Sequence, residues 1–130
     1  MKQKISLIVM TLILILPMAL YAIFKTPQDS VAIAATGKPT VVEFSSQLCS
    51  ECQKLKKVLT VVEPKYSQKI SFQKIDTGRI SRKTQKEIEK YDVKVVPTLI
   101  FLDKDGNMVS KTEGSMSQEV LCTYLDRLIK

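Results

Sequence analysis

The sequence predicts an α/β domain in which helices pack on the faces of a mixed central sheet, preceded by one N-terminal transmembrane helix. Over residues 38–130, short apolar runs typical of strands alternate with longer segments of helical spacing. A late Asp-Gly pair is typical of a hairpin turn, which joins two antiparallel strands. An uncharged apolar stretch spans residues 5–24, which is long enough to cross a bilayer.

The N-terminal segment, residues 1–25, is predicted to be a membrane anchor. As a helix, residues 5–24 would be about 30 Å long, the thickness of the hydrocarbon core of a bilayer. A cleaved signal peptide is the alternative, but its apolar region is usually about 7 to 15 residues long. The small-residue run at 32–34, which resembles a cleavage site, lies well beyond the apolar stretch. We therefore favour an uncleaved anchor.

Basic residues around this stretch predict its orientation. Lys2 and Lys4 precede it and Lys25 follows it, so the positive-inside tendency keeps the N-terminus cytoplasmic. The rest of the chain is then extracytoplasmic at the cell membrane, or secreted or periplasmic if the segment is cleaved. Residues 26–37 carry Pro, Gly and small residues and are interpreted as a linker, so the folded domain is expected over residues 38–130.

The formal net charge of +7 raises the question of nucleic-acid binding. Three of the positive charges flank the apolar stretch, and the others are spread over mixed-sign segments typical of solvated helix faces. No cluster of aromatic and basic residues accompanies the charge, so nucleic acid is not expected as a partner.

The first half of the domain predicts a strand, a helix and a second strand. Residues 40–44 (TVVEF) form a short β-branched run suited to a buried strand. From Cys49 to about Val62 the apolar residues recur at helical spacing, and Pro64 is expected to help end this helix. Residues 70–75 (ISFQKI) alternate between apolar and polar residues, as in a strand.

The second half predicts a polar helix over 81–91, with Ser81 as its N-cap, and a strand over 98–102. Asp-Gly within residues 104–107 predicts the hairpin turn, and a fourth strand follows over 108–112. The chain closes with an amphipathic helix over 118–129. Strands separated by helices are expected to pair in parallel, whereas the hairpin makes the last pair antiparallel.

The cysteines carry the chemistry of the domain. The chain contains Cys49, Cys52 and Cys122 and no His, so a zinc site lacks its remaining ligands and no metal is expected. A structural disulfide between Cys49 and Cys52 would close a very short loop and restrain the unfolded chain only weakly. Redox exchange explains the pair better, because backbone N–H groups and the helix dipole at Cys49 would stabilise a thiolate. Cys52, one turn later, could resolve the mixed disulfide.

The order of these elements resembles the thioredoxin fold over residues 38–130, and three features besides Cys-x-x-Cys support the resemblance. Glu43 lies six residues before Cys49, where thioredoxins carry a buried acid. Pro97 takes the place of the family's cis-proline, and residues 101–109 (FLDKDGNMV) resemble its late hairpin. Leu48 stands where an aromatic residue usually precedes the first cysteine.

The resemblance implies roles for these positions. Glu43 would relay a proton to and from Cys52, since a buried carboxyl can serve as a base near neutrality; the alternative places Glu43 on the solvent face of an edge strand. A cis-Pro97 would face the cysteines, and together with Val96 and Leu48 it would bind the substrate. The alternative is a simple proline at the start of a strand.

The tethered arrangement is similar to membrane-anchored, extracytoplasmic thioredoxin-like proteins that reduce apocytochrome thiols and are recharged by a membrane thiol-electron carrier. We therefore expect an oxidoreductase that reduces disulfides of exported proteins. The alternatives are a disulfide-forming oxidase or isomerase and a non-enzymatic adaptor. Glu51 disfavours a thiolate and supports the reductant, while nearby lysines oppose it.

No cofactor is expected besides the Cys49–Cys52 pair, because no Gly-rich dinucleotide motif occurs and electrons would come from a protein. Cys122 lies beside the apolar stripe of the last helix and is interpreted as a buried structural thiol. A second redox or intermolecular cysteine is the alternative.

Overall fold

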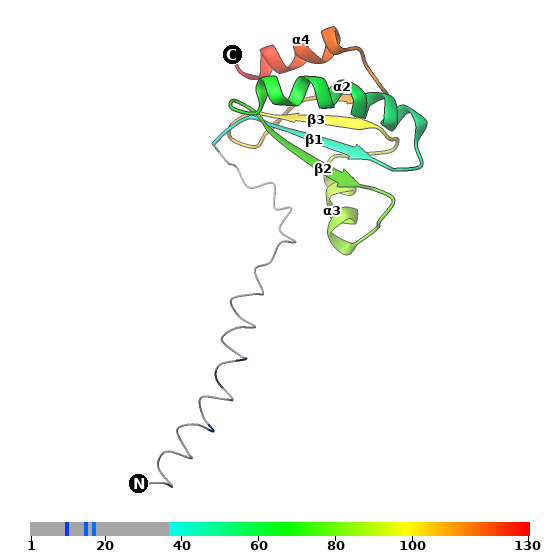
Figure 1. The fold of residues 1–130 in the computed structure, drawn as a ribbon, viewed down its shortest axis with the longest axis vertical. Helices are drawn as coiled ribbons and strands as arrows, with labels where there is room; N and C mark the ends of the chain where they lie inside the picture. The colour runs from blue at the N-terminus through cyan, green and yellow to red at the C-terminus, as the bar shows by residue number, and fades with distance from the viewer. Residues whose placement is uncertain (1–9, 11–14, 16, 18–36) are drawn as a thin grey trace. The chain divides into compact units, whose positions relative to one another are not determined.

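The computed structural model describes residues 10, 15, 17 and 37–130 (Figure 1). The chain divides into two units, residues 1–32 and 33–130, and the second contains every strand described below. Residues 26–36 of the predicted linker and nearly all of the predicted anchor lie outside the described residues. Among the residues that are described, no helix has the length and apolar character needed to cross a membrane.

The domain has the predicted order of elements, with four strands and three helices over residues 37–130. The strands are β1 (Thr40–Ser45), β2 (Ser71–Asp76), β3 (Thr98–Leu102) and β4 (Met108–Glu113). The helices are α2 (Ser50–Tyr66), α3 (Arg82–Lys90) and α4 (Gln118–Leu128). Ser81 caps α3, and its hydroxyl oxygen accepts a hydrogen bond from the Thr84 backbone N–H at 3.1 Å, as predicted.

The four strands form one mixed sheet in the order β2-β1-β3-β4. β1 pairs in parallel with β2, and the hairpin makes β3 and β4 antiparallel, as expected. The expectation that helix-separated strands are parallel is wrong for β3, which runs antiparallel to β1. Phe44 pairs with Thr98, so β3 starts where β1 ends. The short α3 returns the chain to that same end of the sheet instead of crossing back along it.

Helices cover both faces of the sheet. Figure 1 shows α2 and α4 together on one face and α3 on the other. Successive side chains of a strand point to opposite faces, so Val41 of β1 packs under α2 and α4 whereas Val42 packs on the α3 side. By the same alternation Glu43 and Ser45 lie on the α2 face. This places an acidic side chain beneath the helix that carries the cysteines.

Helix α2 runs further than the sequence predicts. Pro64 lies inside the helix, which ends at Tyr66. Val62 is fully buried and Tyr66 packs against the same apolar cluster. The Tyr66 carbonyl accepts hydrogen bonds from Lys69 and Ile70 at 2.9 and 2.8 Å. Packing of this last turn against the core therefore outweighs the helix-ending tendency of the proline.

Candidate active site

The two cysteines lie at the N-terminus of α2, at the end of the loop that follows β1. Cys49 is the N-cap residue, with extended backbone angles (φ −92°, ψ 118°), and is disulfide-bonded to Cys52. The Cys52 backbone N–H donates a hydrogen bond to the Cys49 Sγ at 3.1 Å. One of the unpaired N–H groups of the first helical turn is thus directed at this sulfur, which is the arrangement that stabilises a thiolate in the reduced protein.

The two cysteines differ in accessibility. Cys49 is half-buried, whereas only 3% of Cys52 is exposed. A substrate can therefore reach the Cys49 sulfur, and Cys52 is placed to act only on a bond that Cys49 has already formed. The roles of Cys49 as attacking thiol and Cys52 as resolving thiol stay predictions, which this difference in burial supports.

The predicted Val96–Pro97 segment lies against Cys49. The peptide bond between the two residues is cis, as predicted, and the Val96 carbonyl oxygen is 3.6 Å from the Cys49 Sγ. The Gly114 N–H donates to the Pro97 carbonyl at 2.8 Å and ties this segment to the chain after β4. Leu48 is 98% exposed beside the cysteines. Substrate binding by Leu48, Val96 and Pro97 stays a prediction.

Glu43 lies in the interior of the sheet and not on an edge strand. β1 has a neighbour on each side, and the Glu43 side chain is 8% exposed. Lys74, its register partner on β2, places its Nζ 3.6 Å from the Glu43 Oε1. That oxygen has no hydrogen-bond partner among the described residues. The structure thus rules out a solvent-facing Glu43, while its role in proton transfer stays a prediction.

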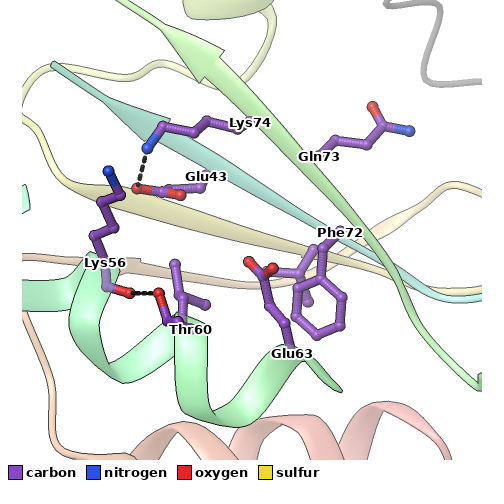
Figure 2. A pocket seen from close by; sticks show the side chains of 9 residues that line it. Glu43, Lys56, Thr60, Glu63, Phe72, Gln73 and Lys74 are labelled. Carbon is purple, nitrogen blue, oxygen red and sulfur yellow. Dashed lines mark hydrogen bonds and ion pairs between the residues drawn. The ribbon is translucent and has the colours of Figure 1, made fainter. Parts of the chain in front are cut away.

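A pocket of about 250 Å³ opens beside Glu43 (Figure 2). It lies between α2 and β2, and its lining includes Lys56, Glu63 and Lys74. A second pocket, of about 400 Å³, reaches Cys52 and shares Lys56 and Lys74 with the first. The sequence did not predict that these three side chains gather beside Glu43. The alternation in ISFQKI could have placed Lys74 on a known face, but its pairing with Glu43 depends on the strand register.

Glu51, between the two cysteines, is held by two partners. Its carboxylate accepts hydrogen bonds from Lys54 Nζ at 2.6 Å and from the Ser115 hydroxyl in the loop after β4. The hydrogen bond from Lys54, followed by that from Ser115, lowers the pKa of Glu51. Its negative charge is therefore permanent near neutrality but partly offset by Lys54.

Removing this charge is expected to make the cysteine pair more oxidising. In Glu51→Gln, Lys54 is no longer opposed and stabilises a thiolate at Cys49, so the reduction potential rises by roughly 10–30 mV at low salt. Ser115→Ala keeps the charge and should change the potential less. The measurement is redox equilibrium against glutathione, and a potential unchanged in Glu51→Gln would contradict the expectation.

Cys122 is a free thiol on α4 and is half-buried against the apolar cluster under α2. Its surroundings are polar on one side, where the Tyr66 hydroxyl donates to Asp126 Oδ1 at 2.8 Å. The Asp126 hydrogen bond, with burial and Cys122 as further causes, raises the pKa of Tyr66. Because Cys122 packs against the core, its interpretation as a structural thiol fits better than its interpretation as a redox or intermolecular cysteine.

Residues 26–129 match the thioredoxin-like domain family, which is most of the chain. The protein therefore belongs to the thioredoxin-like family, and its sheet and flanking helices form the thioredoxin fold. The homologues and the Cys-x-x-Cys pair together support thiol–disulfide oxidoreductase activity.

Several relatives are similar to this chain. The chloroplastic thioredoxin-like protein HCF164 of Arabidopsis thaliana is 29% identical over 94 residues, which cover 72% of this chain and 35% of that protein. A thiol:disulfide interchange protein TxlA homolog of Synechocystis is 23% identical over 124 residues, covering 85% and 68%. This chain spans about a third of the length of its chloroplast HCF164 relatives.

A solved structure resembles the fold directly. The germline-specific thioredoxin Deadhead of Drosophila melanogaster superposes with a TM-score of 0.64 at 25% identity, covering 74% of this chain and 86% of Deadhead.

Proposed function

We propose that this protein is a membrane-tethered, extracytoplasmic thiol–disulfide oxidoreductase that reduces disulfides of exported proteins, for example during cytochrome c maturation. The observation that carries the redox part is the position of the Cys49 sulfur. Cys49 is the half-buried N-cap residue of α2, and its sulfur accepts a hydrogen bond from the Cys52 backbone N–H. Cys52 itself is buried. The uncharged stretch at residues 5–24 supports the tether.

The proposed reaction starts from the dithiol form. The Cys49 thiolate attacks one sulfur of a substrate disulfide, forms a mixed disulfide and releases the first substrate thiolate. Cys52 then loses its proton towards Glu43 and attacks the Cys49 sulfur. The second substrate thiolate leaves, both released thiolates take up protons, and the protein keeps the Cys49–Cys52 disulfide. Two electrons pass to the substrate, and no cofactor beyond the pair is required.

Regeneration needs an external reductant. We propose a membrane thiol-electron carrier as the donor, because it acts by the same exchange chemistry and because no dinucleotide motif occurs in the sequence. The name of the Synechocystis relative, a thiol:disulfide interchange protein, is consistent with exchange between protein thiols.

One observation favours the opposite electron flow. The hydrogen bond from Cys52 N–H to the Cys49 sulfur stabilises a thiolate, and a stabilised reduced form makes a pair more oxidising. A disulfide-forming oxidase or isomerase is therefore the second candidate. A reduction potential below about −200 mV is expected for the reductant, and a value above about −150 mV would favour the oxidase.

Trapping of partners tests the proposal most directly. Cys52→Ser keeps the attacking thiol and removes the resolving one, so mixed disulfides with substrates should accumulate and be released by dithiothreitol. The trapped proteins can be identified by mass spectrometry after non-reducing electrophoresis. A Cys49→Ser/Cys52→Ser double variant is the matched control. Recovery of cytoplasmic proteins only, from cells expressing the full chain, would count against the extracytoplasmic assignment.

A further inference from the structure

A second carboxyl, Glu63 of α2, faces the pocket above Glu43. Figure 2 shows the Glu63 side chain rising from α2 toward the strands, next to Phe72. Both acids line the same cavity of about 250 Å³, and Lys56 and Lys74 complete its charged lining. Glu63 is half-buried, whereas Glu43 is 8% exposed. The two carboxyls therefore occupy the mouth and the floor of one pocket.

Two buried oxygens of β1 have no hydrogen-bond partner among the described residues. They are the Glu43 Oε1 and the Ser45 Oγ, two positions apart on β1 and therefore on the same side of the sheet. Ser45 lines the pocket that reaches Cys52, and Glu43 lines the pocket that Glu63 faces. Buried polar atoms without hydrogen-bond partners beside a roomy polar cavity are typical sites of bound water. Water between them would connect Cys52, Glu43 and Glu63.

The charged side chains near Glu43 bear on how it could exchange a proton with Glu63. Lys74 approaches it from β2 at 3.6 Å but is 51% exposed, and Lys56 lies on α2 at the wall that both pockets share. The Thr60 hydroxyl, also in the lining, donates to the Lys56 carbonyl at 2.8 Å. Burial first, and then the charge of Glu43, raise the pKa of Glu63, while Lys74 opposes the rise. Glu63 therefore takes up a proton more readily than an exposed glutamate does.

The geometry of the reaction makes such a second route useful. In the mixed disulfide, a protein substrate covers the surface around Cys49, Leu48 and Val96, where solvent would otherwise approach the resolving thiol. None of these three residues lines the pocket between α2 and β2, whose lining includes the exposed residues Lys56 and Lys74. A proton that Glu43 takes from Cys52 can leave through this pocket while the substrate is still attached.

We propose that Glu63 is a proton-delivery residue that exchanges the proton of Glu43 with solvent through the hydrated pocket between α2 and β2. This inference rests on the proposed function, because it concerns the step in which Cys52 resolves the mixed disulfide. Glu63 acts through Glu43 and contacts neither cysteine nor substrate. Its contribution is therefore to pass the proton of Glu43 to and from solvent. The pH dependence of this one step is where the contribution should be visible.

A two-phase thiol assay on the full chain tests the proposal. The reduced protein is mixed with the chromogenic disulfide 5,5′-dithiobis(2-nitrobenzoic acid). All proteins carry Cys122→Ser, because the free Cys122 thiol would also release coloured thiolate. Attack by Cys49 then releases the first coloured thiolate, and resolution by Cys52 releases the second. Glu63→Gln is expected to leave the first phase unchanged and slow the second by roughly tenfold near neutral pH, less than the loss of a direct general base. The pH profile of the second phase should move to lower pH, because a nearby negative charge is removed.

Two further variants separate this role from a structural one. Glu63→Asp keeps a carboxyl and should recover most of the second-phase rate. Glu119→Gln removes the same charge from α4, outside the pocket, and should match the unchanged protein. Equal second-phase rates in Glu63→Gln and Glu119→Gln, or an equal slowing of both phases, would overturn the inference. If the unchanged protein itself releases no thiolate in either phase, the proposed oxidoreductase function fails instead.

Discussion

Replacement of Cys49 by serine is expected to abolish disulfide reduction, with a loss of turnover of about 10³-fold or more. The helix N-terminus would stabilise a Cys49 thiolate, which is the reacting nucleophile. A serine hydroxyl is not ionised near neutrality, so the variant has no comparable nucleophile at this position. Cys52 cannot substitute, because only 3% of it is exposed. Reduction of insulin disulfides, with dithiothreitol as the electron donor, measures the effect.

Cys122→Ser provides the matched control for this experiment. It also replaces a thiol with a hydroxyl, but on α4 at a half-buried position of the core. Activity close to that of the unchanged protein is expected, with at most a modest loss of stability. Substantial reductase activity in Cys49→Ser, or its loss in Cys122→Ser, would show that the wrong thiol has been assigned as the nucleophile.

Replacement of Glu43 by leucine is expected to make the domain more stable and less active. A buried carboxylate loses most of its hydration, and an apolar side chain of similar size often stabilises such a site by about 1–3 kcal/mol. Lys74 is 51% exposed, so it can turn to water when its partner is removed and leaves no buried charge. Urea unfolding of the oxidised protein measures the change as a shift in midpoint at constant slope.

The loss of activity in Glu43→Leu should be confined to resolution by Cys52. Without a base nearby, that step is expected to slow by about 10²-fold at neutral pH and to recover as the pH rises and the thiol ionises unaided. The two-phase thiol assay measures both steps. A variant that is less stable than the unchanged protein, or that resolves the mixed disulfide equally fast, would mean that Glu43 is a structural residue.

Local sequence pattern was sufficient for every strand and helix of the domain. The β-branched run TVVEF forms the buried strand β1, and the Asp-Gly turn joins β3 to β4. Ser81 caps its helix because its hydroxyl meets a backbone N–H within the same turn. The Cys49–Cys52 pair was also recognisable, since both cysteines lie on one short segment. Each of these features depends on neighbours only a few residues away.

Three other features, which depend on contacts between distant segments, were not predicted. β3 runs antiparallel to β1 because α3 returns the chain to the same end of the sheet. The last turn of α2 persists past Pro64 because Tyr66 packs against the core. The pocket of Glu43 joins side chains from β1, β2 and α2, and only the parallel register brings Lys74 opposite Glu43. None of these pairings leaves a periodic signal in the sequence.

The exposed leucine beside the cysteines has a kinetic consequence. Leu48 is 98% exposed, and it offers a docking protein less apolar area than an aromatic side chain would at the same place. Since affinity differences of this kind act mainly on dissociation, encounters at this surface should be short. The covalent bond to Cys49, rather than shape recognition, then sets how long a partner stays. We therefore expect target selection to depend mainly on which substrate disulfides react readily with the Cys49 thiolate.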